Sequence, residues 1–424
     1  MAGRPDRLPG IAASLTAAAR RHGTPVAVTD VAELVRAAGD LAAVFPDPWL
    51  RSFSLKANDV RAIVQRIGGL GFGANVVSRG EWSIATRAGI PNGRVTFEGV
   101  GKTDEDLRAA IRASRIGDPL TWLAIESVDE AQALVRLART GIGDGSLDIL
   151  FRLNPSVQPD THAGLAVGAA RSKFGMTSDE LTTAVAIVAE GRGLRPRGMH
   201  LHVGSQLRSV DAWRDGIRRA LSVADLMRGA WQDFDTLDVG GGFPVLSRDE
   251  PAPDAARFAR ELPALLARHD AGRRPSRLAI EPGRALVAGA GYLVGRVLHD
   301  RDRDGRQVVL DVGMTDLIRP ALYGARHEIS ALTSLGRPVD GSTASDAWDL
   351  SRVEGPICES TDHLGEHPLP PLRRGDLVAI RDTGAYAASL GSTYNGRPRA
   401  PQVLLEPDGR LVLARRRGST AGLG

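Results

Sequence analysis

The chain contains three lysines, Lys56, Lys102 and Lys173, among 54 lysine and arginine residues. Arginine stays protonated in proteins, whereas a lysine amine can lose its proton and attack a carbonyl carbon. A sequence that otherwise takes its positive charge from arginine therefore marks its lysines as candidates for nucleophilic chemistry. For Lys102, an incidental surface position is an equally good interpretation.

Reactive side chains also lie at the ends of short apolar runs. Lys56 ends SFSLK, His202 lies near the end of RGMHLHV, and Glu281 ends RLAIE. A carboxylate at the end of an apolar run needs a partner. A protonated pyridine nitrogen would be such a partner, and its protonation would make the ring an electron sink. The alternative is a buried ion pair of Glu281 with Arg152 or Arg284.

Glycine and histidine residues extend this set. Gly240–Gly242 follow an apolar run, and glycine lets backbone N–H groups approach phosphate oxygens closely. A tight turn is the alternative. His200 and His202 are expected to share one face of a strand, where an imidazole could stack on a flat cofactor ring. No further histidine or cysteine lies near them in the sequence to complete a metal shell, so we expect no metal.

Short apolar runs alternate with amphipathic stretches from about residue 50 to 285, and they would position these residues. Eight alternations are the number that closes a (β/α)8 barrel, whose reactive residues lie at the C-terminal ends of the strands. We predict an α/β fold with a TIM-like barrel; an open doubly wound sheet is the alternative. The predicted strands are 52–56, 73–77, 94–98, 121–125, 148–153, 197–203, 234–239 and 277–281.

The pattern changes after residue 285, where short β-rich runs are separated by turn residues. This indicates a second, C-terminal all-β domain. We assign residues 31–285 to the barrel and residues 1–30 with 286–424 to the β-rich domain, although the run at 24–30 could instead add a strand to the barrel. Residues 335–350 are expected to form a loop.

Composition excludes several classes of protein. A net charge of +4 and 25% charged residues argue against nucleic-acid binding, and 42% apolar residues argue against disorder. The single cysteine, Cys358, cannot form a disulfide within the chain. No apolar run reaches the length of a membrane span, and the N-terminus lacks a signal-peptide core. We expect a soluble, cytoplasmic protein.

The chain resembles the fold-type III pyridoxal-phosphate decarboxylases, and among them most resembles the diaminopimelate decarboxylases. The similarity spans roughly residues 53–400, and its motifs follow in the expected order. They are FSLKAN (53–58), VVSRGEW (76–82), GVGKTDEDL (99–107), RLNPSVQPDTHAGLAVGAARSKFGM (152–176), HLHVGSQ (200–206), DVGGGF (238–243), EPGR (281–284), DVGMTDLIRPALYGARHEI (311–329), GPICESTD (355–362) and DTGAYAASLGSTYNGRPR (382–399).

The resemblance implies a pyridoxal 5'-phosphate enzyme that acts as a head-to-tail homodimer with shared active sites. It implies that Lys56 holds the cofactor as an imine and that Cys358 of the partner subunit donates a proton to the substrate carbon. The cofactor-binding residues that it implies are Lys56, His202, Ser205, Gly240, Gly241, Gly242, Glu281, Gly283, Arg284 and Tyr386.

The same resemblance implies that Arg284, Arg319, Tyr323, Glu359 and Tyr386 bind the substrate. A guanidinium complements a carboxylate, so Arg319 favours an amino acid with a distal carboxylate. This indicates conversion of meso-diaminopimelate to L-lysine.

Three residues depart from the family pattern: Asn75 replaces a usual aspartate, Arg79 a small residue and Thr361 a usual glycine. An alternative is therefore the same reaction on a modified or carrier-tethered amino acid of secondary metabolism. A non-catalytic regulator of this fold is disfavoured, because such relatives usually lose the lysine or the cysteine, and Lys56 and Cys358 are both present.

Overall fold

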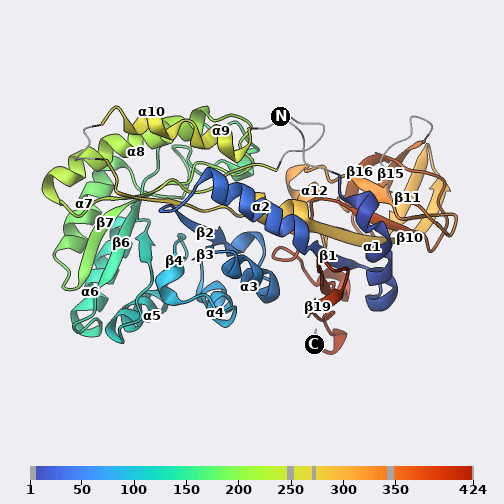
Figure 1. The fold of residues 1–424 in the computed structure, drawn as a ribbon, viewed down its shortest axis with the longest axis horizontal. Coiled ribbons are helices and arrows are strands. Elements are labelled where there is room, and N and C mark those ends of the chain that lie inside the picture. The colour runs from blue at the N-terminus through green and yellow to red at the C-terminus, as the bar shows by residue number, and fades with distance from the viewer. Residues whose placement is uncertain (1–5, 246–252, 270–273, 341–347, 423–424) are drawn as a thin grey trace. The chain divides into compact units, whose positions relative to one another are not determined.

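The computed structural model describes residues 6–245, 253–269, 274–340 and 348–422 (Figure 1). Contacts within the chain divide it into two compact units, residues 38–285 and residues 1–37 with 286–424. Each unit is described by itself. Helix α2 (Val31–Val44) crosses the first boundary, and α11 (Arg284–Val287) crosses the second.

The first unit is a closed barrel of eight parallel strands, β2 to β9. Pairing of β2 with β9 closes the ring, with Leu50 opposite Ala279. The barrel prediction is therefore confirmed, and the open sheet is excluded. The strands are β2 (Leu50–Ser54), β3 (Gly73–Val76), β4 (Val95–Phe97), β5 (Trp122–Ile125), β6 (Leu147–Arg152), β7 (Leu194–His200), β8 (Thr236–Asp238) and β9 (Arg277–Ile280).

Helices alternate with these strands along the chain. Side-chain caps begin several of them: Thr103 and Asp106 form a capping box at α5, and Thr177 and Glu180 form another at α7. Such caps satisfy backbone N–H groups that have no partner inside the helix. The helices are α3 (Arg61–Gly69), α4 (Arg79–Arg87), α5 (Asp104–Arg115), α6 (Val128–Gly141), α7 (Ser178–Ala189), α8 (Asp211–Ala230), α9 (Ala255–Ala259) and α10 (Leu262–Leu266).

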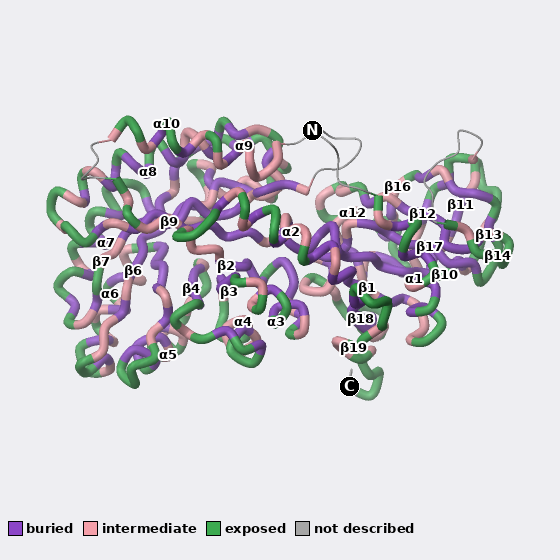
Figure 2. The backbone as a smooth tube through the Cα atoms, viewed as in Figure 1, coloured by how far each residue is buried: buried purple, intermediate pink, exposed green. Residues whose placement is uncertain are grey.

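Most residues of the barrel strands are buried on both faces, and these are purple in Figure 2. Trp122, Ala124, Leu150 and Ala279 form an apolar cluster contributed by β5, β6 and β9. Parallel strands covered on both sides read as continuous apolar runs, which is why all eight were visible in the sequence.

The second unit contains a nine-stranded mixed sheet organised around the long strand β10. The first part of β10 pairs with β1 on one side and β17 on the other, and its second part pairs with β11. The strands are β1 (Val26–Asp30), β10 (Gly291–Asp302), β11 (Arg306–Leu310), β12 (Ile329–Ala331), β15 (Leu350–Glu354), β16 (His363–Pro368), β17 (Leu377–Ile380), β18 (Gln402–Leu405) and β19 (Leu411–Arg415).

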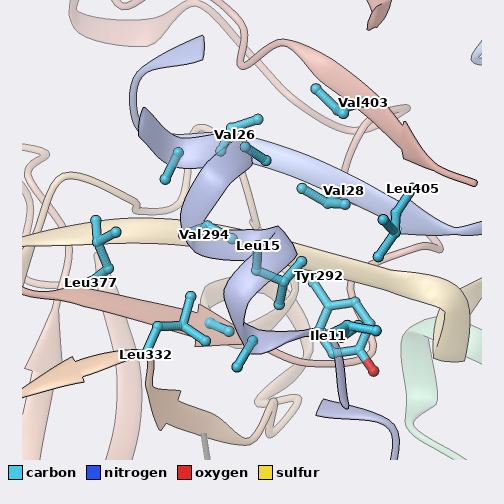
Figure 3. Packing of buried hydrophobic residues seen from close by; sticks show 14 of the residues in the cluster. Ile11, Leu15, Val26, Val28, Tyr292, Val294, Leu332, Leu377, Val403 and Leu405 are labelled. Carbon is cyan, nitrogen blue, oxygen red and sulfur yellow. The ribbon is translucent and has the colours of Figure 1, made fainter. Parts of the chain in front are cut away.

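Helix α1 (Leu8–His22) packs its apolar face on this sheet (Figure 3). Ile11 and Leu15 contact a cluster that includes Val26, Tyr292 and Val403. Burying each such aliphatic side chain stabilises the unit by roughly 1.5–3 kcal/mol. The unit is thus not purely β, because it also includes α1 and the short helix α12 (Arg319–Tyr323).

The structure decides one open alternative and corrects one expectation. The run at 24–30 does not add a strand to the barrel: β1 pairs with β10 and β18 of the mixed sheet, in the unit to which residues 1–30 were assigned. Part of the expected loop at 335–350 forms β14 (Arg337–Pro338), which pairs with β13 (Thr333–Ser334), while residues 341–347 lie outside the described residues. Among the described residues, no helix is both long and apolar enough to cross a membrane.

Candidate functional site

Lys56 lies in a turn just beyond the end of β2. The strand ends at Ser54, and Lys56 is the middle residue of a 3-10 turn, Leu55–Ala57, with its side chain exposed between buried neighbours. Ser54 N donates to Pro282 O at 3.2 Å, and Gly283 packs against Ser54 and Ala57. The turn that carries the amine is therefore fixed against the loop that follows β9.

Backbone hydrogen bonds connect Gly240–Gly242 to the loops that follow β9 and β7. Glu281 N donates to Gly240 O at 2.9 Å, and Leu207 N donates to Gly242 O at 3.3 Å. A Cβ atom added at Gly241 would lie 2.3 Å from Glu281 O, and one at Gly242 would lie 2.5 Å from Gly204 O. Close backbone packing is thus sufficient to require glycine here, whatever the loop binds.

His202 and Ser205 lie on the loop that follows β7. Gly241 N donates to His202 Nδ1 at 3.2 Å, which fixes the orientation of the imidazole and leaves its proton on Nε2. Arg284 Nη2 donates to Ser205 Oγ at 3.2 Å. Exclusion of water, and then the charge of Lys56, hold the pKa of His202 well below its usual value. The loops that carry Lys56, His202, Ser205, the glycines and Glu281 are therefore joined at one mouth of the barrel.

Glu281 belongs to a buried polar cluster inside this mouth. Asn75 Nδ2 donates to its Oε1 at 2.5 Å, and His200 Nε2 lies 3.3 Å from its Oε2. The same nitrogen of His200 lies 3.2 Å from Glu98 Oε2. One carboxylate oxygen each of Glu98 and Glu281 and one ring nitrogen of His200 lie within 4.8 Å of one another. Shared protons would reduce the repulsion between the two carboxylates at this spacing, and so would a bound cation. The expectation of no metal stays a prediction.

Burial strongly changes the protonation of this cluster. It raises the pKa of Glu98 to about 8, with repulsion from Glu281 as the next cause. Burial, followed by repulsion from Glu281, raises the pKa of Asp238 well above its usual value. It lowers the pKa of His200 to about 4. At neutral pH the cluster thus favours protonated Glu98 and Asp238 and a neutral His200.

The two arginines proposed as ion-pair partners of Glu281 each have another hydrogen-bond partner in the described part of the chain. Arg152 Nη1 donates to Glu126 Oε1 at 2.7 Å, and Arg284 donates to Ser205. Lys102 also differs from the surface interpretation: its side chain is 0% exposed, and Nζ lies 3.0 Å from Glu130 Oε1. That ion pair gives Lys102 a structural role just before helix α5.

The second unit contains the remaining candidates. Cys358 and Glu359 are exposed, and Tyr394 Oη donates to Glu359 Oε1 at 2.6 Å. Thr361 Oγ1 donates to Glu359 Oε2 at 3.2 Å. Asp362 accepts from Ile357 N at 2.7 Å and from Met314 N at 2.5 Å, so it holds the turn that carries the cysteine.

Arg319 begins helix α12, and Tyr323 ends it. Arg319 Nη1 lies 2.7 Å from His327 Nε2, and His327 Nδ1 lies 2.9 Å from Arg381 O. An arginine only donates, so the imidazole must accept at Nε2 and donate at Nδ1. Tyr386 is partly exposed and has a positive φ of 59°.

Two details of the sequence interpretation were wrong or incomplete. Strand β7 ends at His200, so His202 does not share a strand face with it, and the two imidazoles have different neighbours. Glu98 and Asp238 were not selected as site residues. The signal was present, because the predicted strand 94–98 ended in Glu98 just as 277–281 ended in Glu281.

Comparisons with known proteins bear on the whole chain. The family described as "Pyridoxal-dependent decarboxylase, pyridoxal binding domain" matches residues 31–288. A diaminopimelate decarboxylase of Pseudomonas aeruginosa is 35% identical over 408 residues, covering 95% of this chain and 92% of the relative. One of Zymomonas mobilis is 34% identical over 377 residues, covering 88% and 84%. The crystal structure of diaminopimelate decarboxylase from Helicobacter pylori with L-lysine has a TM-score of 0.86 at 29% identity, covering 96% of this chain and 98% of that one.

Proposed function

The chain belongs to the pyridoxal-dependent decarboxylases, and from this membership we propose that it converts meso-diaminopimelate to L-lysine with pyridoxal 5'-phosphate as its cofactor. The observation that carries the proposal is the set of hydrogen bonds joining the Lys56 turn, the glycine loop and the His202 loop around Glu281. This set brings an amine, a fixed neutral imidazole and a buried carboxylate to one barrel mouth. The amine suits an aldehyde, the imidazole a flat ring and the carboxylate a protonated pyridine nitrogen.

Each barrel residue has a separate task in this proposal. Lys56 would hold the cofactor through its amine, His202 and Glu281 would hold the ring, and Ser205 with Gly240–Gly242 and Gly283 would hold the phosphate. Pyridoxal phosphate, when bound, supplies an electron sink for the charge left on the substrate carbon as carbon dioxide departs. Because Gly241 N already fixes the imidazole of His202, that ring is held before any ligand arrives.

Residues of the second unit would select the substrate and return the proton. Arg319 would bind the distal carboxylate together with Tyr323, and Glu359 would bind the distal amine. Arg284 and Tyr386 would contact both the cofactor and the substrate. Cys358 would donate the proton, as a residue of the partner subunit in a homodimer with shared sites.

The domain assignment follows from these tasks. We propose that residues 31–285 bind the cofactor, and that residues 1–30 with 286–424 contribute the substrate and proton-donor residues. The relatives are named for a biosynthetic activity on a small amino acid, which supports a cytoplasmic enzyme that binds neither nucleic acid nor membrane.

The direct test is carbon dioxide release by the purified, cofactor-loaded protein from meso-diaminopimelate, ornithine, lysine and arginine. The proposal expects the largest kcat/KM for meso-diaminopimelate, because only this substrate carries a distal carboxylate. A larger kcat/KM for ornithine or lysine would refute the distal-carboxylate assignment, and no release from any amino acid would refute the decarboxylase.

One contact supports a second candidate substrate. Both carboxylate oxygens of Glu359 already accept hydrogen bonds, one from Tyr394 and one from Thr361, which stands where the family usually has glycine. The added hydroxyl would suit a substrate whose distal amine is modified, as in a carrier-tethered amino acid. Replacing Thr361 by glycine distinguishes the two substrates. If the modified amino acid is the substrate, Thr361→Gly should raise kcat/KM for free meso-diaminopimelate.

A further inference from the structure

Seven consecutive barrel strands contribute one polar side chain each to the cluster around Glu281. Glu98 lies close to three of the others: its carboxylate is within 4.8 Å of Glu281, it lies 3.2 Å from His200 Nε2, and it accepts from Trp122 Nε1 at 3.4 Å. The seven side chains are Asn75 of β3, Glu98 after β4, Trp122 of β5, Arg152 of β6, His200 of β7, Asp238 of β8 and Glu281 after β9. All seven are at most 6% exposed, so water does not screen their charges.

Three buried carboxylates, Glu98, Asp238 and Glu281, lie close enough together in this volume to repel one another. Arg152 acts on Glu98 electrostatically, but its guanidinium is hydrogen-bonded to Glu126. His200 is neutral at physiological pH, because burial lowers its pKa to about 4. Buried carboxylates without compensating cations keep a proton, since ionising all of them would leave repelling charges in a dry site.

We propose that Glu98 is a positioning residue that remains protonated and donates its hydrogen to Glu281, so that Glu281 keeps its negative charge for the ring nitrogen of the cofactor. The inference rests on the proposed function only in naming the cofactor. Its geometric basis is the position of the two carboxylates: His200 Nε2 lies 3.2 Å from Glu98 Oε2 and 3.3 Å from Glu281 Oε2, and these groups lie within 4.8 Å of one another. Asn75 is a second neutral donor, to Oε1 of Glu281.

This arrangement gives Glu281 two neutral donors, Asn75 and the protonated Glu98. An amide and a carboxylic acid stabilise and orient the anion without cancelling it. The replacement of the usual aspartate by Asn75 belongs to the same arrangement, because an aspartate would add a fourth carboxylate to the cluster.

The first test is the pH dependence of unfolding of the full chain without cofactor, in the wild type and in Glu98→Gln. Folded Glu98 has a pKa of about 8 and keeps its proton up to that pH, whereas an unfolded glutamate loses it near its ordinary pKa of 4.5. The folded state therefore binds one more proton in this window and loses stability as the pH rises. The unfolding constant should rise by up to about tenfold per pH unit more steeply in the wild type than in Glu98→Gln, and level off above pH 8.

Two comparisons make this result specific. Glu190→Gln, an exposed glutamate of the same unit, should keep the wild-type slope. Asp238 contributes a slope of the same sign, so the difference between wild type and Glu98→Gln is the quantity that counts. Equal slopes for wild type and Glu98→Gln would overturn the proposal. So would one bound metal per chain by elemental analysis with a slope that a chelator changes.

The second test is cofactor affinity, measured by equilibrium titration of the cofactor-free chain. Glu98→Gln keeps a neutral donor and should bind pyridoxal phosphate within about threefold of wild type. Glu98→Ala should bind it about 10- to 100-fold more weakly, the cost of a lost hydrogen bond to a charged group. Wild-type affinity in Glu98→Ala would overturn the positioning role. Neither test uses the reaction, so a protein that fails to decarboxylate would refute the proposed function and leave these results standing.

Discussion

The candidate residues of the two units are held in opposite ways. In the barrel, backbone hydrogen bonds tie the Lys56 turn, the glycine loop and His202 together around a buried Glu281. In the second unit, Cys358 and Glu359 are exposed. Glu359 accepts hydrogen bonds from the side chains of Tyr394 and Thr361, and the backbone N–H of Cys358 donates to the side chain of Asn395. The barrel arrangement leaves little room for substitution, whereas exposed side chains can change without disturbing a backbone. In the proposed function, the residues that hold the cofactor thus lie on fixed barrel loops, whereas the proton donor and most of the substrate-binding residues lie in the second unit.

The largest expected effect comes from Lys56. Lys56→Arg keeps the positive charge but removes the amine that can be deprotonated. It should reduce kcat by about 10⁴-fold or more, on the scale of losing a covalent nucleophile, and abolish the visible absorbance of lysine-bound cofactor. Lys173→Arg, a second exposed lysine of the same unit, is the matched control and should retain both. Substantial activity in Lys56→Arg would contradict the assignment.

A smaller loss should follow removal of the proton donor. Cys358→Ala should lower kcat by about 10²- to 10⁴-fold, the usual contribution of a positioned general acid, with little change in cofactor absorbance. Cys358→Ser should recover only part of the rate, because a hydroxyl is a weaker acid than a thiol. Mixing Cys358→Ala with Lys56→Arg tests the shared site, since mixed dimers would regain one intact site. No recovery on mixing would count against a donor supplied by the partner subunit.

Arg319 should change selectivity more than rate. Arg319→Leu removes the guanidinium for the distal carboxylate and should raise KM for meso-diaminopimelate about 10- to 100-fold. KM for ornithine, which lacks that carboxylate, should change far less. Arg303→Leu, at an exposed arginine of the same unit, should change neither value. Equal increases for both substrates would show that Arg319 is structural.

The sequence predicted the barrel well because its signal is local. Each strand is a short apolar run followed by an amphipathic helix, so eight alternations were visible without any long-range information. The partner of residues 24–30 was not visible, because β1 pairs with β10 and β18, which are far from it in the chain. Sheet membership depends on such distant pairings, and one sequence contains no record of them.

Part of the site was predicted because its signals are also local in the sequence. Strand ends identified Lys56 and Glu281, and family motifs identified His202 and Ser205. Asn75, Glu98 and Glu281 come close together only when the ring closes, because β9 pairs with β2 and β8 and is far along the chain from β3 and β4. The sequence showed Asn75 as a departure from the family pattern, but the structure was needed to show that it donates to Glu281.

Arg79 tests the comparison of the two units from the barrel side. Among the departures from the family pattern, it should have the smallest effect. It begins helix α4, its side chain is 51% exposed, and it lies 3.6 Å from Glu105, which is 78% exposed. Exposed ion pairs contribute little, because water and salt screen them. Arg79→Ala should therefore change the free energy of unfolding by less than about 0.5 kcal/mol and leave kcat/KM unchanged, as should Arg108→Ala in a similar exposed pair with Asp104. A change in substrate preference in Arg79→Ala alone would show that the barrel surface also selects the substrate, and the division between the two units would then be wrong.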